Sequence, residues 1–108
     1  MTDVTFGDAV LKADSLVLVE FWAPWARDCG QAEPPLRMAA DALGARVRLV
    51  RLNVEQNPVA AVVYGVQRIP TVLLFRDGRD IDRWSRALAA RDIVERVQAA
   101  IEGSESGH

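Results

Sequence analysis

The sequence predicts an α/β domain in which helices cover both faces of a central mixed β-sheet. Leu16–Trp22 is an apolar, valine-rich run, typical of a strand that is covered on both faces. Segments with apolar residues at helical spacing alternate with such strands, which indicates a βαβ unit with parallel strands. Asp77-Gly78 is a tight-turn signal between two later strand-like segments, so the second half is expected to add antiparallel strands.

The first half of the chain is predicted to contain a helix, a strand and a second helix. Thr5–Lys12 carries apolar residues on one helical face, with Thr5 as the expected N-cap. After the strand Leu16–Trp22, the stretch Cys29–Leu43 has leucine and alanine at helical spacing. We expect Gly44 to end this helix, because glycine readily adopts the left-handed conformation that follows many helices.

The middle of the chain predicts a second strand and a short helix. Val47–Val54 has the length and alternation of a strand and is expected to be buried. Asn57 is an expected N-cap, and Pro58 suits the first helical position because that position needs no backbone donor. The resulting helix is predicted to run to Tyr64 and to end at Gly65.

The last third is predicted to form a hairpin and a final helix. Thr71–Arg76 and Arg79–Ser85 are the expected strands on either side of the turn. Arg91–Ile101 places isoleucine and valine on one helical face. We expect one domain over residues 1–102, followed by a flexible, polar, Gly/Ser-rich tail over residues 103–108.

Composition excludes several classes of function. The chain has 108 residues and a net charge of -2, with no basic stripe, so nucleic-acid binding is not expected. It shows no secretory signal and no apolar run long enough to span a bilayer, so no membrane association is expected. One cysteine cannot form an internal disulfide, which favours a reducing cytoplasm. His108 is the only histidine and has no partner residues nearby in sequence, so neither a metal site nor a cofactor is expected.

A series of short motifs resembles the thioredoxin family over about residues 4–101. The most specific are Phe21-Trp22-Ala23-Pro24-Trp25, followed by Cys29 and Pro34, and the later Ile69-Pro70-Thr71. Weaker matches occur at 52–58, 64–66 and 75–78. The resemblance implies the thioredoxin fold and a place in the family that maintains the redox state of cellular thiols.

The resemblance also assigns roles at the centre of the site. In a family member with a complete dithiol, the attacking cysteine would occupy the position of Ala26, and Cys29 would be the more buried cysteine that resolves the mixed disulfide. Glu20 matches a buried carboxylate, an aspartate in many relatives, that accepts or relays the proton of the resolving thiol. Cys29 and Glu20 are therefore the candidate catalytic residues, while the nucleophile position holds alanine.

Further residues resemble the surface that surrounds the thiols and contacts a partner. Trp22, Pro24 and Trp25 match the apolar rim of the site. Pro70 matches the family's cis-proline, and the peptide bond that follows Ile69 contacts the substrate chain in relatives. These residues are the candidate binding surface for a protein or peptide.

The chain departs from the family pattern at several positions on the same predicted face. Arg27-Asp28 replaces the usual Gly-Pro between the two cysteine positions. Arg86 replaces a glycine and Arg68 a small residue, both at positions that line the substrate groove, which these side chains would narrow or charge. Ala26 is either an engineered substitution or a native divergence. The neighbouring departures favour native divergence, because a single engineered change would leave them ordinary.

Three functions follow from these observations. The first is a protein without dithiol activity that binds extended protein or peptide clients. The second is a monothiol protein in which Cys29 forms mixed disulfides. The third is a genuine thioredoxin, a protein-disulfide oxidoreductase that carries a cysteine-to-alanine change at Ala26 and is reduced by a thioredoxin reductase. The first two share a chain that lacks a complete dithiol site, and they are the preferred interpretation.

Overall fold

The structure is a computed structural model that describes residues 16–27 and 29–105. Within this part of the chain, strands and helices follow one another along the sequence with the bounds β1 Leu16–Trp22, α2 Cys29–Leu43, β2 Val47–Asn53, α3 Pro58–Val63, β3 Thr71–Arg76, β4 Arg79–Trp84 and α4 Ala90–Glu105. A short 3-10 turn, Gly44–Arg46, connects α2 to β2. The helix predicted at Thr5–Lys12 lies outside the described residues.

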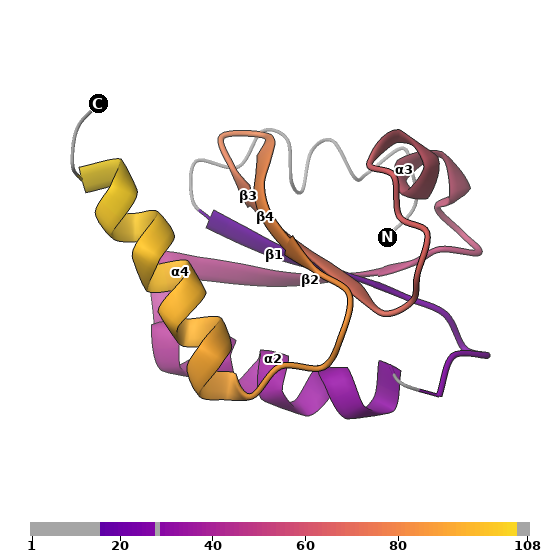
Figure 1. Ribbon diagram of the computed structural model, residues 1–108, viewed down its shortest axis with the longest axis horizontal. Coiled ribbons are helices and arrows are strands. Elements are labelled where there is room, and N and C mark those ends of the chain that lie inside the picture. Colours follow the sequence, from indigo (N-terminus) through magenta and orange to yellow (C-terminus); the bar gives the residue numbers. More distant parts are fainter. Residues whose placement is uncertain (1–15, 28, 106–108) are drawn as a thin grey trace.

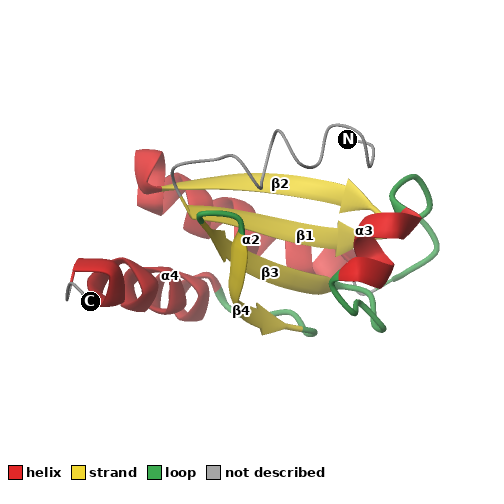
Figure 2. Cartoon of the chain, turned by 90° about the horizontal axis from the view of Figure 1, so that it is seen from above, coloured by secondary structure: helices red, strands yellow, loops and turns green. Residues whose placement is uncertain are grey.

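The described strands form one mixed sheet in the order β2-β1-β3-β4. β1 pairs with β2 in parallel, and the β1–β3 and β3–β4 pairs are antiparallel. Figure 2 shows the strands side by side in this order, with β4 at one edge. The parallel βαβ unit followed by an antiparallel hairpin agrees with the sequence prediction.

Helices cover both faces of the sheet, as predicted. Figure 1 shows α2 and α4 on one side of the strands and α3 on the other. Because side chains alternate along a strand, β1 and β3 each contribute to both faces. Leu18 and Leu74 belong to the core beneath α2 and α4, whereas Phe21 and Phe75 belong to the core beneath α3. These two cores pack the sheet against the helices on either face, and this packing positions the ends of the strands.

Most predicted boundaries of helices and strands lie within a residue or two of those observed. Three features differ from the prediction: the burial of β2, the cap of α3 and the end of α4. β2 is less buried than predicted, because Arg48 is exposed and Arg51 is half-buried. Asn57 precedes α3, but its side chain forms no capping bond; its Nδ2 donates instead to the carbonyl oxygen of Asn53 at 2.8 Å. α4 continues to Glu105, so residues 103–105 are helical rather than part of a flexible tail.

None of the helices in the described part of the chain is long and apolar enough to cross a membrane.

Candidate functional site

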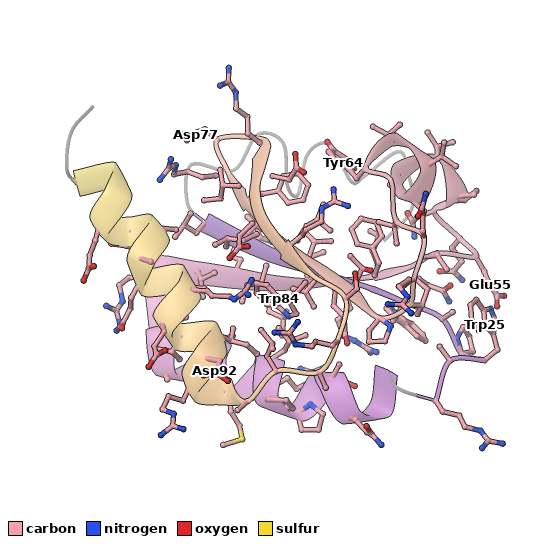
Figure 3. All side chains as sticks on the ribbon, viewed as in Figure 1. Trp25, Glu55, Tyr64, Asp77, Trp84 and Asp92 are labelled. Carbon is pink, nitrogen blue, oxygen red and sulfur yellow. The ribbon has the colours of Figure 1, made fainter. Side chains whose placement is uncertain are left out.

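The aromatic loop that follows β1 forms a tight turn at one end of the sheet. Ala23 is buried, and its carbonyl oxygen accepts a hydrogen bond from the backbone N–H of Ala26 at 3.1 Å. Pro24 and Trp25 lie at the tip of this turn, where Trp25 is 65% exposed. Figure 3 shows Trp25 beyond the strand ends, on the side of the molecule where β1 and β2 finish. The loop therefore presents a large apolar side chain to solvent, which is typical of a contact surface.

Ala26 and Cys29 lie on either side of the start of α2. Ala26 is half-buried and precedes the helix, whereas Cys29 is its first residue. The N–H of Gly30 donates to the carbonyl oxygen of Arg27 at 3.2 Å, which closes the first turn of the connection. The structure does not describe Asp28 or the side chain of Cys29. The side chain of Ala26 is thus a methyl group that lies just before the first turn of α2.

Glu20 is a fully buried carboxylate on β1, beneath the aromatic loop. It lies opposite Arg51 in the parallel β1–β2 register, and the Nε of Arg51 donates to Oε1 of Glu20 at 2.8 Å. Among the described residues, Oε2 of Glu20 has no hydrogen-bond partner. Burial raises the pKa of Glu20, and the hydrogen bond and charge of Arg51 only partly oppose this shift. Within the described residues, one carboxyl oxygen therefore lacks a hydrogen bond that would favour the charged form.

Arg51 connects Glu20 to the neighbouring side chains. Its guanidinium lies 4.5 Å from the ring centroid of Trp22, a cation–π distance, and its Nη1 is 3.6 Å from Oε2 of Glu33 on α2. Glu33 also pairs with Arg37 one turn further along the helix. The guanidinium of Arg51 thus contacts side chains from β1 and α2, and Trp22, which lies beneath it, is half-buried.

A groove lies at the other side of the site, around the Ile69–Pro70 peptide bond, which is cis. It has a volume of about 320 Å³, and its lining residues come from α2, the loop before β3 and the loop after β4: Gln31, Arg68, Ile69, Pro70, Ser85, Arg86 and Ala87. Pro70 is buried and Ile69 is half-buried, where it packs against the core beneath α3. The groove is therefore built on a fixed apolar floor with polar side chains above it.

Two hydroxyl groups hold the walls of this groove together. The buried Thr71 donates from Oγ1 to the carbonyl oxygen of Arg68 at 2.5 Å, and the same Oγ1 is 3.0 Å from Oγ of Ser85. Because the single proton of Thr71 is used on Arg68, Ser85 must be the donor in the second bond. This network ties the backbone before the cis-proline to the end of the β3–β4 hairpin.

The structure brings together some of the predicted site residues and separates others. Four of them line one groove: Arg68, Ile69, Pro70 and Arg86. The aromatic loop residues Trp22, Pro24 and Trp25 are not among the residues that line it. Glu20 lies inside the sheet, paired across the strand register.

Sequence reasoning missed the partners of the predicted residues. Arg51 lies within the predicted strand Val47–Val54 and carries no local signal of its role, although a buried carboxylate is stabilised by a nearby cation. A parallel pairing of the two strands would have placed Arg51 opposite Glu20. Thr71 and Ser85 gave no sequence signal, because their bond depends on the hairpin register. Among residues 16–27 and 29–105, no group of three or more histidine, cysteine, aspartate or glutamate side chains is placed to hold a metal ion.

Several known proteins are similar to this chain over most of its length. The sequence profile of the thioredoxin family matches residues 1–99. A thioredoxin from Rhodospirillum rubrum is 38% identical over 101 residues, which cover 94% of this chain and 97% of the relative. A thioredoxin from Chlorobaculum thiosulfatiphilum is 34% identical over 93% of each chain. Thioredoxin 1 from Synechococcus elongatus is 39% identical over 76% of this chain and 77% of its own length.

The profile match spans most of the chain, and relatives above 30% identity align along almost their whole length. The mixed sheet between two helical layers is the arrangement that the motif series predicts. The sequence has one cysteine, Cys29, and alanine at position 26. On the strength of the profile match and the relatives, the chain belongs to the thioredoxin family.

Proposed function

We propose that this protein has no disulfide reductase activity of its own and acts by binding extended segments of client proteins. Ala26 carries the proposal, because thiol–disulfide exchange by a dithiol needs an attacking thiolate and a second thiol that displaces it from the mixed disulfide. The sequence holds only Cys29, so a mixed disulfide formed there has no internal thiol to release it. The chain therefore lacks a catalytic cycle even if Cys29 reacts once.

The surface around the missing thiol supports binding. The groove beside Pro70 has an ordered wall, and Trp25 presents an exposed indole at the same end of α2 as Ala26. An extended segment would gain affinity from backbone pairing along the groove and from apolar contact with the indole. We propose protein or peptide clients as the partners and the cytoplasm as the compartment, since a single cysteine suits a reducing environment.

The test is insulin reduction with dithiothreitol as the electron source, measured for the unchanged chain, Ala26→Cys and Cys29→Ser. We expect the unchanged chain to accelerate reduction no more than Cys29→Ser does. A gain of activity in Ala26→Cys would show that the missing thiol alone silences an otherwise competent site. No activity in Ala26→Cys would mean that the neighbouring residues have also changed the site. Acceleration by the unchanged chain but not by Cys29→Ser would overturn the proposal and make Cys29 a nucleophile.

Two alternatives make distinct predictions. If Cys29 acts as a monothiol, exposure to oxidised glutathione followed by mass spectrometry should show one added glutathione, and an unmodified chain excludes this role. If the protein is a genuine thioredoxin with a changed residue at Ala26, the natural gene encodes cysteine there, and Ala26→Cys should be reduced by a thioredoxin reductase. Neither alternative requires a metal or a cofactor in the chain itself.

A further inference from the structure

Among the described residues, the lining of the groove beside Pro70 includes two arginines and no acidic residue. Arg68 lies in the loop before β3 and Arg86 follows β4, so the two approach the groove from different elements. Its other lining residues are uncharged: Gln31, Ile69, Pro70, Ser85 and Ala87. The chain as a whole has a net charge of -2, so this groove differs in sign from the molecule around it.

Neither arginine side chain forms an ion pair within the described part of the chain. Other arginines there form ion pairs, such as Arg37 with Glu33, Arg51 with Glu20 and Arg96 with Asp82. Arg68 and Arg86 are both exposed and take part in none of the ion pairs found among the described residues. A guanidinium without an internal acid keeps its planar set of donors for an external carboxylate, which it can bind through two parallel hydrogen bonds.

The backbone under both arginines is held in place by one network. Thr71 bonds to the carbonyl oxygen of Arg68, and Ser85, which bonds to Thr71, directly precedes Arg86. The two charged side chains therefore emerge from backbone positions whose separation the hydroxyl network fixes. Fixed attachment points reduce the entropy that is lost when both guanidinium groups bind one ligand.

Acidic residues of α4 affect the two arginines unequally. Arg86 also borders a neighbouring hollow of about 370 Å³ whose lining includes Asp92, Glu95 and Arg96. Arg68 does not line that hollow. Besides Arg86, the lining of that hollow holds two carboxylates and one guanidinium. Their net negative charge should offset part of the charge of Arg86, so we expect Arg68 to contribute more to the attraction of an anion.

We propose that this groove selects extended protein segments in which an aspartate or glutamate side chain lies between Arg68 and Arg86. The proposal rests on the proposed function, the binding of extended segments at this groove, and it names the class of segment. Charge complementarity supports it, because two arginines without an ion pair in the described part of the chain line one groove, and none of its described lining residues is acidic.

The experiment is an NMR titration of the ¹⁵N-labelled full chain with three ten-residue peptides, acetylated and amidated, that differ only in a central Glu, Gln or Lys. We expect the Glu peptide to bind roughly three to ten times more tightly than the Gln peptide at low salt, the size of one or two exposed ion pairs. Raising the salt to about 0.5 M should remove this preference, because it shortens the screening length. The amide shifts should centre on residues 68, 69 and 85–87, because Pro70 has no backbone N–H.

Three variants assign the preference to the groove. Arg68→Gln should lose most of the preference for Glu, and Arg86→Gln should lose less. Arg48→Gln is the matched control, because Arg48 is an exposed arginine on β2 that does not line the groove. It removes the same charge and should leave the preference unchanged. An equal loss in Arg48→Gln and Arg68→Gln would reduce the effect to net charge and overturn the proposal.

The remaining outcomes separate this inference from the proposed function. If all three peptides shift groove residues with equal affinity, the groove binds segments without selecting acids, so this inference fails and the proposed function stands. If no peptide shifts groove residues at any concentration, both fail.

Discussion

Glu20 combines complete burial with a single protein hydrogen bond. Its Oε1 accepts from Arg51, while Oε2 has no partner among the described residues. Burial disfavours the charged carboxylate more than the guanidinium favours it, so the pKa of Glu20 is raised above its ordinary value of 4.5. The side chains of Glu20 and Arg51 are long enough to reach each other directly across neighbouring strands, close to the aromatic loop that follows β1.

Glu20→Gln tests this balance through the pH dependence of stability. A carboxyl group whose pKa is higher in the folded than in the unfolded state stabilises the fold fully below the unfolded pKa, and that contribution is lost as the pH rises through the folded pKa. The difference in unfolding free energy between the unchanged chain and Glu20→Gln should therefore favour the unchanged chain most below about pH 4.5. This advantage should decline toward neutral pH. Urea denaturation of both chains between pH 4 and pH 8 measures this difference. Glu55→Gln, at an exposed glutamate, is the control. A stability of the unchanged chain relative to Glu20→Gln that increases with pH would contradict the assignment.

At the scale of the element, the β3–β4 hairpin and the turn after α2 depend on residues with positive φ. Asp77 and Gly78 have φ values of 52° and 81°, the left-handed pair that a tight hairpin turn of this hand requires. Gly44 ends α2 with a φ of 62°. Both features were predictable, because Asp-Gly and a glycine after a helical repeat are local signals. The irregularity in the β3–β4 register between Leu74 and Phe75 was not predictable, since it depends on how the two strands meet.

Two glycine-to-alanine substitutions separate backbone conformation from crowding. An added Cβ meets no atom within 4 Å at either Gly44 or Gly30, but only Gly44 has a positive φ. Gly44→Ala should lower the free energy of unfolding by about 1–2 kcal/mol, because an L-residue is strained in the left-handed region. Gly30→Ala, in the first turn of α2, should leave stability unchanged or raise it by up to about 1 kcal/mol. Thermal denaturation followed by circular dichroism compares them, and equal effects would refute the conformational explanation.

At the scale of the whole molecule, one sheet serves two cores. Consecutive residues of β3 face opposite layers, so that Leu74 packs beneath α2 and α4 while Leu73 packs beneath α3. The same alternation in β1 places the carboxylate of Glu20 on the face that carries Leu18. Glu20 is thus a polar residue on the face of one apolar core, and Ile69 of the groove packs against the other core. The helical layers on both sides of the sheet must therefore fold before the candidate site can form.

Core truncation should reveal this dependence. Leu74→Ala and Leu73→Ala each remove a fully buried side chain and should cost about 2–5 kcal/mol of unfolding free energy. Val62→Ala, at a position on α3 that is 80% exposed, should change stability by less than about 0.5 kcal/mol. Urea denaturation measured by circular dichroism and by tryptophan fluorescence should give coincident transitions for each variant. Two separate transitions would mean that the layers unfold independently.

The contrast between what the sequence predicted and what it missed has a physical basis. The strands Leu16–Trp22 and Thr71–Arg76 have the predicted bounds, because burial on both faces leaves a continuous apolar run. The positions of Arg68 and Arg86 on one groove followed from the family resemblance rather than from any local pattern. The Glu20–Arg51 pair joins residues far apart in sequence, and only strand register brings them together.

The charges of β4, which lies at one edge of the described sheet, affect how two copies of the chain can associate. β4 lies at an edge of the sheet, and four of its six residues are charged, ending at the buried Trp84. A free strand edge is a template for the addition of a strand from another molecule. Here an added strand would have to desolvate Arg79, Asp80, Asp82 and Arg83 before gaining any backbone bond. The charged residues of β4 thus protect this edge of the sheet against edge-to-edge aggregation, in a protein that we propose binds other chains in an extended form.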